Sequence, residues 1–210
     1  MGVPADRFDG WIAGVGTASG LRAVLGRWAR SPFGPFADVM VERADGHRLL
    51  LAPTPGVADY VAATYRFDEV RVVPVVVRVD GPWWAVAAGP LELRFVVAGR
   101  PALGVLLCAV PRPVATRAAW VRAADVVARR VLPGVRTVGT AGGGRRELYA
   151  ALDMHRIAAA AVTWEGRDQG PLAPVTPPVR FGFGSAPATP SLVRMVTLVE
   201  DLTEHMNPRR

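Results

Sequence analysis

Hydrophobic and polar residues alternate along much of this chain, a period of two that is typical of β-strands with one buried face. The segment LELRFVV at 91–97 shows it most clearly, with every odd position apolar and with Glu92 and Arg94 on the other side. Further runs are rich in β-branched and aromatic residues, which strands favour. Strands are therefore expected at 37–43, 47–52, 69–79, 82–88, 91–97, 179–184 and 192–200.

Two Asp-Gly pairs mark turns between neighbouring strands. Asp45-Gly46 and Asp80-Gly81 each follow one expected strand and precede another. Glycine readily adopts the positive φ that a tight hairpin turn requires. Each pair therefore predicts a β-hairpin.

Two other segments have the apolar period of helices. The first covers about 55–65, where Thr54 is positioned to cap the N-terminus and a proline occupies the first turn. The second covers about 114–132, where apolar residues line one side and charged residues the other. Pro133 and the glycine after it end this second helix.

Expected strands outnumber expected helices, and several of the strands are joined by hairpins. No internal repeat or long linker interrupts the sequence. The prediction is one α+β domain over residues 1–210, with a predominantly antiparallel, curved sheet and two main helices.

The segment ELYAALDMHRIAAAAVTWEG at 147–166 admits two interpretations. Its alanines favour a helix. Its polar residues, however, fall on alternate positions, as in a curved strand that covers a cavity. We favour the strand, which would place Tyr149, Asp153 and His155 on one face. A helix would instead turn Asp153 and His155 to different sides.

A strand would also place Asp153 and His155 about 7 Å apart at Cα, from the rise per residue. The carboxylate could then orient the imidazole, which would make His155 a candidate general base. The alternative is a structural histidine, hydrogen-bonded at the rim of a sheet. We favour the structural interpretation, because no nucleophile accompanies His155 in the sequence.

The basic residues of this chain are unusual in kind and in distribution. All 25 are arginine, and lysine is absent, which excludes a side-chain Schiff base and a lysine-dependent phosphate loop. The net charge is +7 and the pI about 11.0. The arginines are nevertheless dispersed, whereas nucleic-acid binding needs a clustered basic surface. A nucleic-acid partner is therefore not expected.

Other chemistries find little support. Cys108 stands alone in an apolar run and is expected to pack as a small hydrophobe. His47, His155 and His205 lack the spacing of ligand pairs, so no metal is expected. The glycine spacing of GVGTASG at 14–20 does not fit a dinucleotide fingerprint, and no cofactor is predicted.

The apolar runs are interrupted by Arg, Pro or Gly before they reach membrane-spanning length. The N-terminus carries charges and lacks the apolar core of a signal peptide. We therefore expect a cytoplasmic protein with no membrane partner.

Two segments resemble acetoacetate decarboxylases and their relatives. SPFGPFADVMV at 31–41 is similar to a pocket segment of that family, and 147–166 with the following PLAPVTPPVRF is similar to its late strand. The resemblance implies a cone-like antiparallel β-barrel around a small-molecule pocket, with Asp38 where the family has a pocket glutamate. The family's catalytic lysine, which forms a Schiff base with a β-keto acid, has no counterpart here. The resemblance therefore implies a lysine-less relative that does not decarboxylate by that route.

Together these features predict a protein that binds a small anionic metabolite in a β-barrel pocket, with an arginine as counter-charge. The alternative is a structural or protein-interaction domain, such as a homo-oligomer, in which some of the six tryptophans form the contact surface. The candidate ligand-binding residues are Asp38, Tyr149, Asp153, His155, Arg22 and Arg94.

Overall fold

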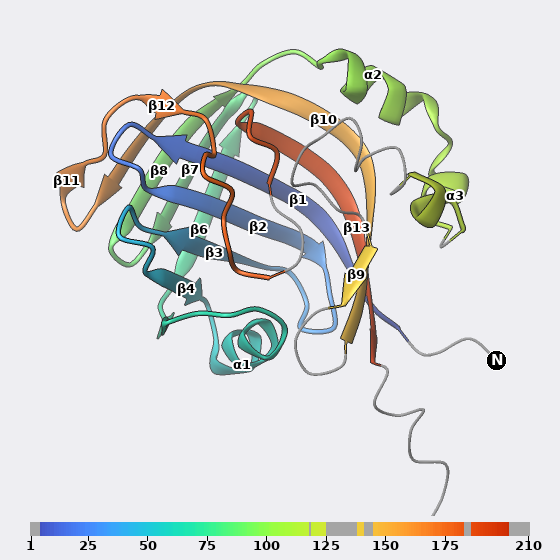
Figure 1. Cartoon of the computed structure of the whole chain (residues 1–210), viewed down its shortest axis with the longest axis horizontal. Helices are drawn as coiled ribbons and strands as arrows, with labels where there is room; N and C mark the ends of the chain where they lie inside the picture. Colours follow the sequence, from blue (N-terminus) through green and yellow to red (C-terminus); the bar gives the residue numbers. More distant parts are fainter. Residues whose placement is uncertain (1–4, 118, 125–137, 141–144, 183–185, 202–210) are drawn as a thin grey trace, which may run out of the picture.

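The computed structural model describes residues 5–117, 119–124, 138–140, 145–182 and 186–201. They form an α+β structure dominated by strands (Figure 1), as the sequence predicts. The elements are β1 (Ala5–Thr17), β2 (Arg22–Arg30), β3 (Phe36–Glu42), β4 (Arg48–Ala52), α1 (Pro55–Thr64), β5 (Glu69–Val72), β6 (Val75–Asp80), β7 (Trp83–Ala88), β8 (Leu91–Val97), α2 (Ala102–Ala109), α3 (Arg112–Ala115), β9 (Val138–Thr140), β10 (Arg145–Trp164), β11 (Arg167–Asp168), β12 (Leu172–Ala173) and β13 (Ser191–Asp201).

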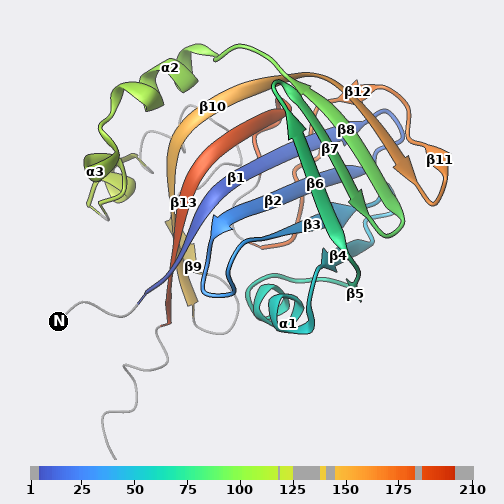
Figure 2. The same cartoon turned by 180° about the vertical axis from the view of Figure 1, so that it is seen from behind.

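The strands form one curled sheet in the order β5-β4-β3-β2-β1-β13-β10-β8-β7-β6. Its two ends fold toward each other, so that β6, β7 and β8 lie behind β1 to β4 (Figures 1 and 2). Neighbouring strands are antiparallel except β4 and β5, which α1 joins by a crossover. The predicted class, a predominantly antiparallel curved sheet with helices, is confirmed.

Strand β10 makes the curl possible because it belongs to both halves of the sheet. Residues 145–156 pair with β13, and residues 157–164 pair with β8. The register shifts once within each stretch, and such β-bulges bend a strand and increase its twist. The strand interpretation of 147–166 is therefore confirmed, and the helical one is wrong.

The main hydrophobic core fills the inner, concave face of the curled sheet. It joins Val39 and Leu49 from the β1–β4 half to Leu93 and Phe95 from β8, all of them almost fully buried. Alternation along each strand explains this packing, since every second side chain points inward. The inner face therefore closes by sheet-on-sheet contact.

The outer, convex face is covered by α1 and by residues 174–182, which we call the covering segment. Thr54 caps the N-terminus of helix α1, as the sequence predicts: its hydroxyl accepts from the backbone N–H of Val57 at 3.4 Å. Val175 and Phe181 of the covering segment pack on Val24 of β2. A second, smaller apolar layer thus forms outside the sheet.

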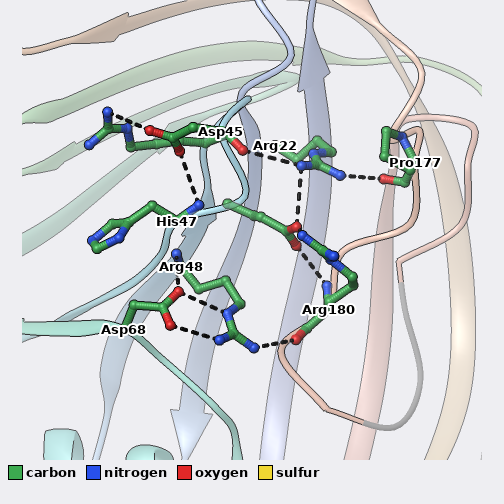
Figure 3. A network of polar contacts seen from close by, with 9 residues as sticks. Arg22, Asp45, His47, Arg48, Asp68, Pro177 and Arg180 are labelled. Atoms are coloured by element: carbon green, nitrogen blue, oxygen red, sulfur yellow. Dashed lines mark hydrogen bonds and ion pairs between the residues drawn. The ribbon is translucent and has the colours of Figure 1, made fainter.

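A buried ion-pair network holds the covering segment in place (Figure 3). Glu42 of β3 has no exposed surface; it pairs with Arg22 at 3.3 Å and accepts from the backbone N–H of Arg180 at 2.7 Å. Arg22 in turn donates to the carbonyl oxygen of Pro177 at 2.7 Å, and Arg48 donates to that of Arg180 at 3.3 Å. These contacts connect β2, β3 and β4 to the covering segment.

The strand expected at 179–184 is wrong for the residues described there, 179–182, which form no strand. Two prolines precede them, and proline has no N–H for a ladder. The backbone N–H of Arg180 instead donates to the side chain of Glu42. Side-chain hydrogen bonding has therefore replaced strand pairing in this segment.

The second predicted helix, 114–132, lies partly outside the described residues. Residues 119–124 are helical, and the short α3 precedes them. Helix α2 was not predicted from the sequence; it carries Cys108, which is exposed and not packed as expected. None of the helices in the described ranges has the length and apolar character needed to cross a bilayer.

The Glu42 network yields a stability prediction. Glu42→Gln removes the carboxylate charge and leaves the buried Arg22 guanidinium without its counter-ion, which we expect to lower the free energy of unfolding by about 3 kcal/mol. Asp45→Asn is the matched control, because its ion pair with Arg43 is about half exposed and should contribute less than about 1 kcal/mol. Urea unfolding measures both values. Similar losses in the two variants would contradict the anchoring role of Glu42.

Candidate functional site

The first bulge in β10 separates the polar residues that the sequence suggests as one site. Tyr149 lies opposite Thr197 of β13, whereas Asp153 lies opposite Arg194. Paired residues share a face, and Thr197 and Arg194 are three positions apart, so they point to opposite faces. The prediction that Tyr149, Asp153 and His155 share one face is therefore wrong: Tyr149 is on the outer face and the other two are on the inner face.

On the outer face, Tyr149 and Asp38 line the same cavity, which we call the outer cavity. It lies between the sheet and α1 and is partly open. The volume in which the centre of a water-sized molecule can lie is about 60 Å³. A single water needs about 10–15 Å³ by this measure, so the outer cavity has room for a small ligand. Its lining comprises Phe8, Ile12, Val24, Gly26, Trp28, Phe36, Asp38, Met40, Tyr60, Val61, Thr64, Tyr65, Glu147, Tyr149, Thr197 and Val199.

Asp38 is a buried acid in this cavity without an ion-pair partner among the described residues. It projects from β3 beside Gly26, where an added Cβ would lie 2.6 Å from its Oδ1. Trp28 donates its Nε1–H to Oδ1 at 3.1 Å. Burial raises the pKa of Asp38 to about 7, although the Trp28 hydrogen bond opposes the shift. Asp38 therefore changes charge near neutral pH.

Three further side chains of the lining form a compact hydrogen-bond network. The hydroxyls of Tyr65 and Tyr149 each donate to Glu147, at 3.0 and 2.8 Å to its Oε2, and also contact each other. Burial, and then the nearby Glu147 carboxylate, raise the pKa of Tyr65. Burial, and then Tyr65 and Glu147, raise the pKa of Tyr149. Both phenols therefore stay protonated at neutral pH.

Sequence reasoning missed Tyr65 and Glu147 as members of this site. Glu147 had a usable signal, since it stands two positions before Tyr149 on a strand and therefore on the same face. Tyr65 follows the last residue of α1 and gives no such signal. It reaches the cavity only because α1 packs on the outer face.

On the inner face, Asp153 and His155 are held in a separate set of contacts. Arg100 donates twice to Asp153, from Nε to Oδ1 at 2.8 Å and from Nη2 to Oδ2 at 2.9 Å. Burial raises the pKa of Asp153, but these hydrogen bonds outweigh burial and bring the pKa well below its usual range. His155 places Nε2 3.1 Å from Asp153 and Nδ1 3.1 Å from the carbonyl oxygen of Ala98. With both ring nitrogens engaged, the geometry favours a structural histidine over a general base.

Two arginines flank a tryptophan beside these residues. Trp11 pairs in register with Arg27 of β2 and with Arg194 of β13. The Arg194 guanidinium lies 5.5 Å from the Trp11 ring centre, and that of Arg27 lies 5.6 Å from the ring centre of Trp84. Arg194 also donates to Asp9, whereas the Arg27 guanidinium has no hydrogen bond or ion pair to another described residue. We call Trp11, Arg27, Arg194, Asp153 and His155 the inner cluster.

The two arginines proposed from the sequence as counter-charges lie elsewhere. Arg22 is engaged by Glu42 and by the covering segment. Arg94 points away from the core of β8 and is exposed, as its alternation with Leu93 and Phe95 requires. Neither residue lines the outer cavity.

Comparison with known proteins adds little to this geometry. No family model matches the sequence, and no curated protein matches it. Among solved structures, the chain is similar to the crystal structure of acetoacetate decarboxylase from Legionella pneumophila, at 11% identity and a TM-score of 0.43, over 94% of this chain and 85% of that one.

The state of Asp38 leads to a prediction about pH and stability. An unfolded aspartate ionises near pH 4, whereas folded Asp38 ionises near pH 7, so between these values the unfolded chain binds fewer protons. The free energy of unfolding should therefore fall as pH rises from about 4 to about 7, by up to about 4 kcal/mol from this residue.

Asp38→Asn should abolish this dependence, because the amide stays neutral and can still accept from Trp28. We expect the variant to match the wild type at pH 4 and to exceed it in stability at pH 8, as measured by urea unfolding at both values. A variant less stable than the wild type at pH 8 would contradict the assignment.

Proposed function

We propose that this protein binds a small molecule in the outer cavity. The observation that carries the proposal is that one partly open cavity is lined both by the buried Asp38 and by the Tyr65–Tyr149–Glu147 network. Binding sites combine a mostly apolar lining with a few well-placed polar groups, and this lining follows that pattern.

Energetics also favour a ligand over a purely structural role for Asp38. A buried acid whose pKa is raised to about 7 lowers the stability of the folded state at neutral pH. A neutral asparagine amide could accept the same hydrogen bond from Trp28 without this cost, so the fold alone does not require an acid at this position. A ligand that interacts with the carboxyl group would offset this cost.

The anionic ligand expected from the sequence suits the inner cluster better than the outer cavity. Arg27 is partly buried against Trp84 and lacks an ion-pair partner in the described part of the chain. Its guanidinium can bind a carboxylate through two parallel hydrogen bonds, with Arg194 and Trp11 beside it. Binding of a small carboxylate at the inner cluster is therefore a second candidate function.

The first candidate predicts a ligand response that depends on the outer cavity. In a thermal-shift screen of neutral, cationic and anionic small molecules, at least one class should stabilise the protein, by about 2.7 kcal/mol at one hundred times its Kd. Thr197→Met extends a side chain into the cavity and should abolish the response while the protein stays folded. If no compound shifts the melting temperature and light scattering shows a tight oligomer, the results would instead favour a protein-interaction domain.

The second candidate predicts that Arg27→Gln weakens the binding of acetate or benzoate by about ten-fold or more, because a charge-assisted hydrogen bond contributes about 1.5–3 kcal/mol. Arg94→Gln is the matched control, since Arg94 is an exposed arginine away from the inner cluster. Isothermal titration calorimetry measures both affinities. Equal affinities in the two variants would exclude carboxylate binding by Arg27.

A further inference from the structure

The two carboxyl side chains in the mostly apolar lining of the outer cavity, Asp38 and Glu147, are its charged groups among the described residues. Asp38 and Glu147 are 4% and 2% exposed, and the described residues of the lining include no arginine and no histidine. This contrasts with the whole chain, whose net charge is +7. Within the described lining, an anion would find no basic side chain, whereas a cation could pair with the Asp38 carboxylate in a region of low polarity.

Aromatic side chains surround the acidic groups. The Phe8 ring centre lies 5.6 Å from that of Trp28 and 5.5 Å from that of Tyr60, and Phe36 packs edge-on to Phe8 at 6.4 Å. The faces of aromatic rings carry partial negative charge and attract cations. Aromatic rings beside a carboxylate are the usual environment in which proteins bind ammonium groups.

The cavity volume limits the size of the ligand. About 60 Å³ for the centres of water-sized molecules corresponds to a few heavy atoms, so a nucleotide or a large cofactor would not fit wholly inside the outer cavity. Gly26 contributes to this space, since any larger residue would bring a Cβ to 2.6 Å from Oδ1 of Asp38. The ligand group that fits is small and compact.

We propose that the occupant of the outer cavity is a small organic cation, an ammonium or short alkylammonium group, held by the ionised carboxylate of Asp38 against the surrounding aromatic rings. This inference rests on the proposed function and names its ligand class. It follows from the acidic lining, the aromatic rings and the small volume, which each favour the same chemistry.

Binding of such a cation should depend on pH through Asp38. The other titratable groups that line the cavity are Tyr60 from α1, Tyr65 after it, and Glu147 and Tyr149 from β10. The pKa values of Tyr65 and Tyr149 are raised, so these phenols remain neutral. Asp38, whose pKa is about 7, attracts a cation only when ionised, so binding should release a proton below pH 7. Affinity should then fall by up to about ten-fold per pH unit below 7.

The test uses the full chain with methylammonium and tetramethylammonium chlorides as probes and sodium chloride at equal ionic strength as reference. We expect saturable binding by calorimetry at pH 8 and about ten-fold or more weaker binding at pH 5.5. At pH 6.5, proton release should make the observed binding enthalpy differ between buffers of different ionisation enthalpy. Asp38→Asn should lose the binding at both pH values. Asp45→Asn, which changes an exposed carboxylate outside the outer cavity, should retain it.

The outcomes separate this inference from the proposed function. Equal binding by the wild type and Asp38→Asn, or binding without pH dependence or proton release, would overturn the cation assignment. If neutral or anionic compounds bind the wild type but not Thr197→Met, and the ammonium probes do not bind, the proposed ligand class is wrong. The outer cavity then remains a binding site. If no compound of any class binds, both proposals fail. If Asp38→Asn is folded at both pH values, as urea unfolding would show, its loss of binding reflects the missing charge and not unfolding.

Discussion

The arrangement of the outer face depends on the buried carboxylate of Glu42. A charge removed from water must be paired and hydrogen-bonded, and here Arg22 and the backbone of Arg180 satisfy it. This requirement determines where the covering segment crosses the sheet. The carbonyl oxygen of Phe181 in that segment accepts from the backbone N–H of Arg66 at 2.7 Å. Arg66 directly follows Tyr65, which lines the outer cavity and contacts Glu147. Pairing of one buried charge thus connects the sheet, the covering segment and the wall of the cavity.

The bulge in β10 gives the two faces of the sheet different chemistry. One extra residue in the strand reverses the alternation, so Tyr149 joins Asp38 on the outer face and Asp153 joins Arg194 on the inner face. The outer face consequently presents acids among aromatic rings. The inner face presents arginines stacked on tryptophans, together with acids that are already paired. The two proposed binding sites would therefore favour ligands of opposite charge.

Much of the fold followed from local patterns. The alternation in 91–97 and the glycine turns identified strands and hairpins that the structure confirms, and the cap at Thr54 identified α1. The segment 147–166 was correctly assigned as a strand because side-chain period outweighed the helix propensity of alanine. The strand predicted at 179–184 is wrong for residues 179–182, because the backbone N–H of Arg180 donates to the side chain of Glu42, which is far away in the sequence.

For the candidate site, the sequence by itself determined the available chemistry: no lysine amine, one cysteine, three histidines, and strands that carry Asp38 and Tyr149. It could not determine which of these residues meet. A bulge arises from the pairing of a strand with its neighbours, and a single unpaired residue reverses every side chain beyond it. Burial is likewise a property of the packed molecule, and burial brings the pKa of Asp38 to about 7. Tertiary structure alone therefore decided the membership, the charge and the pH response of the site.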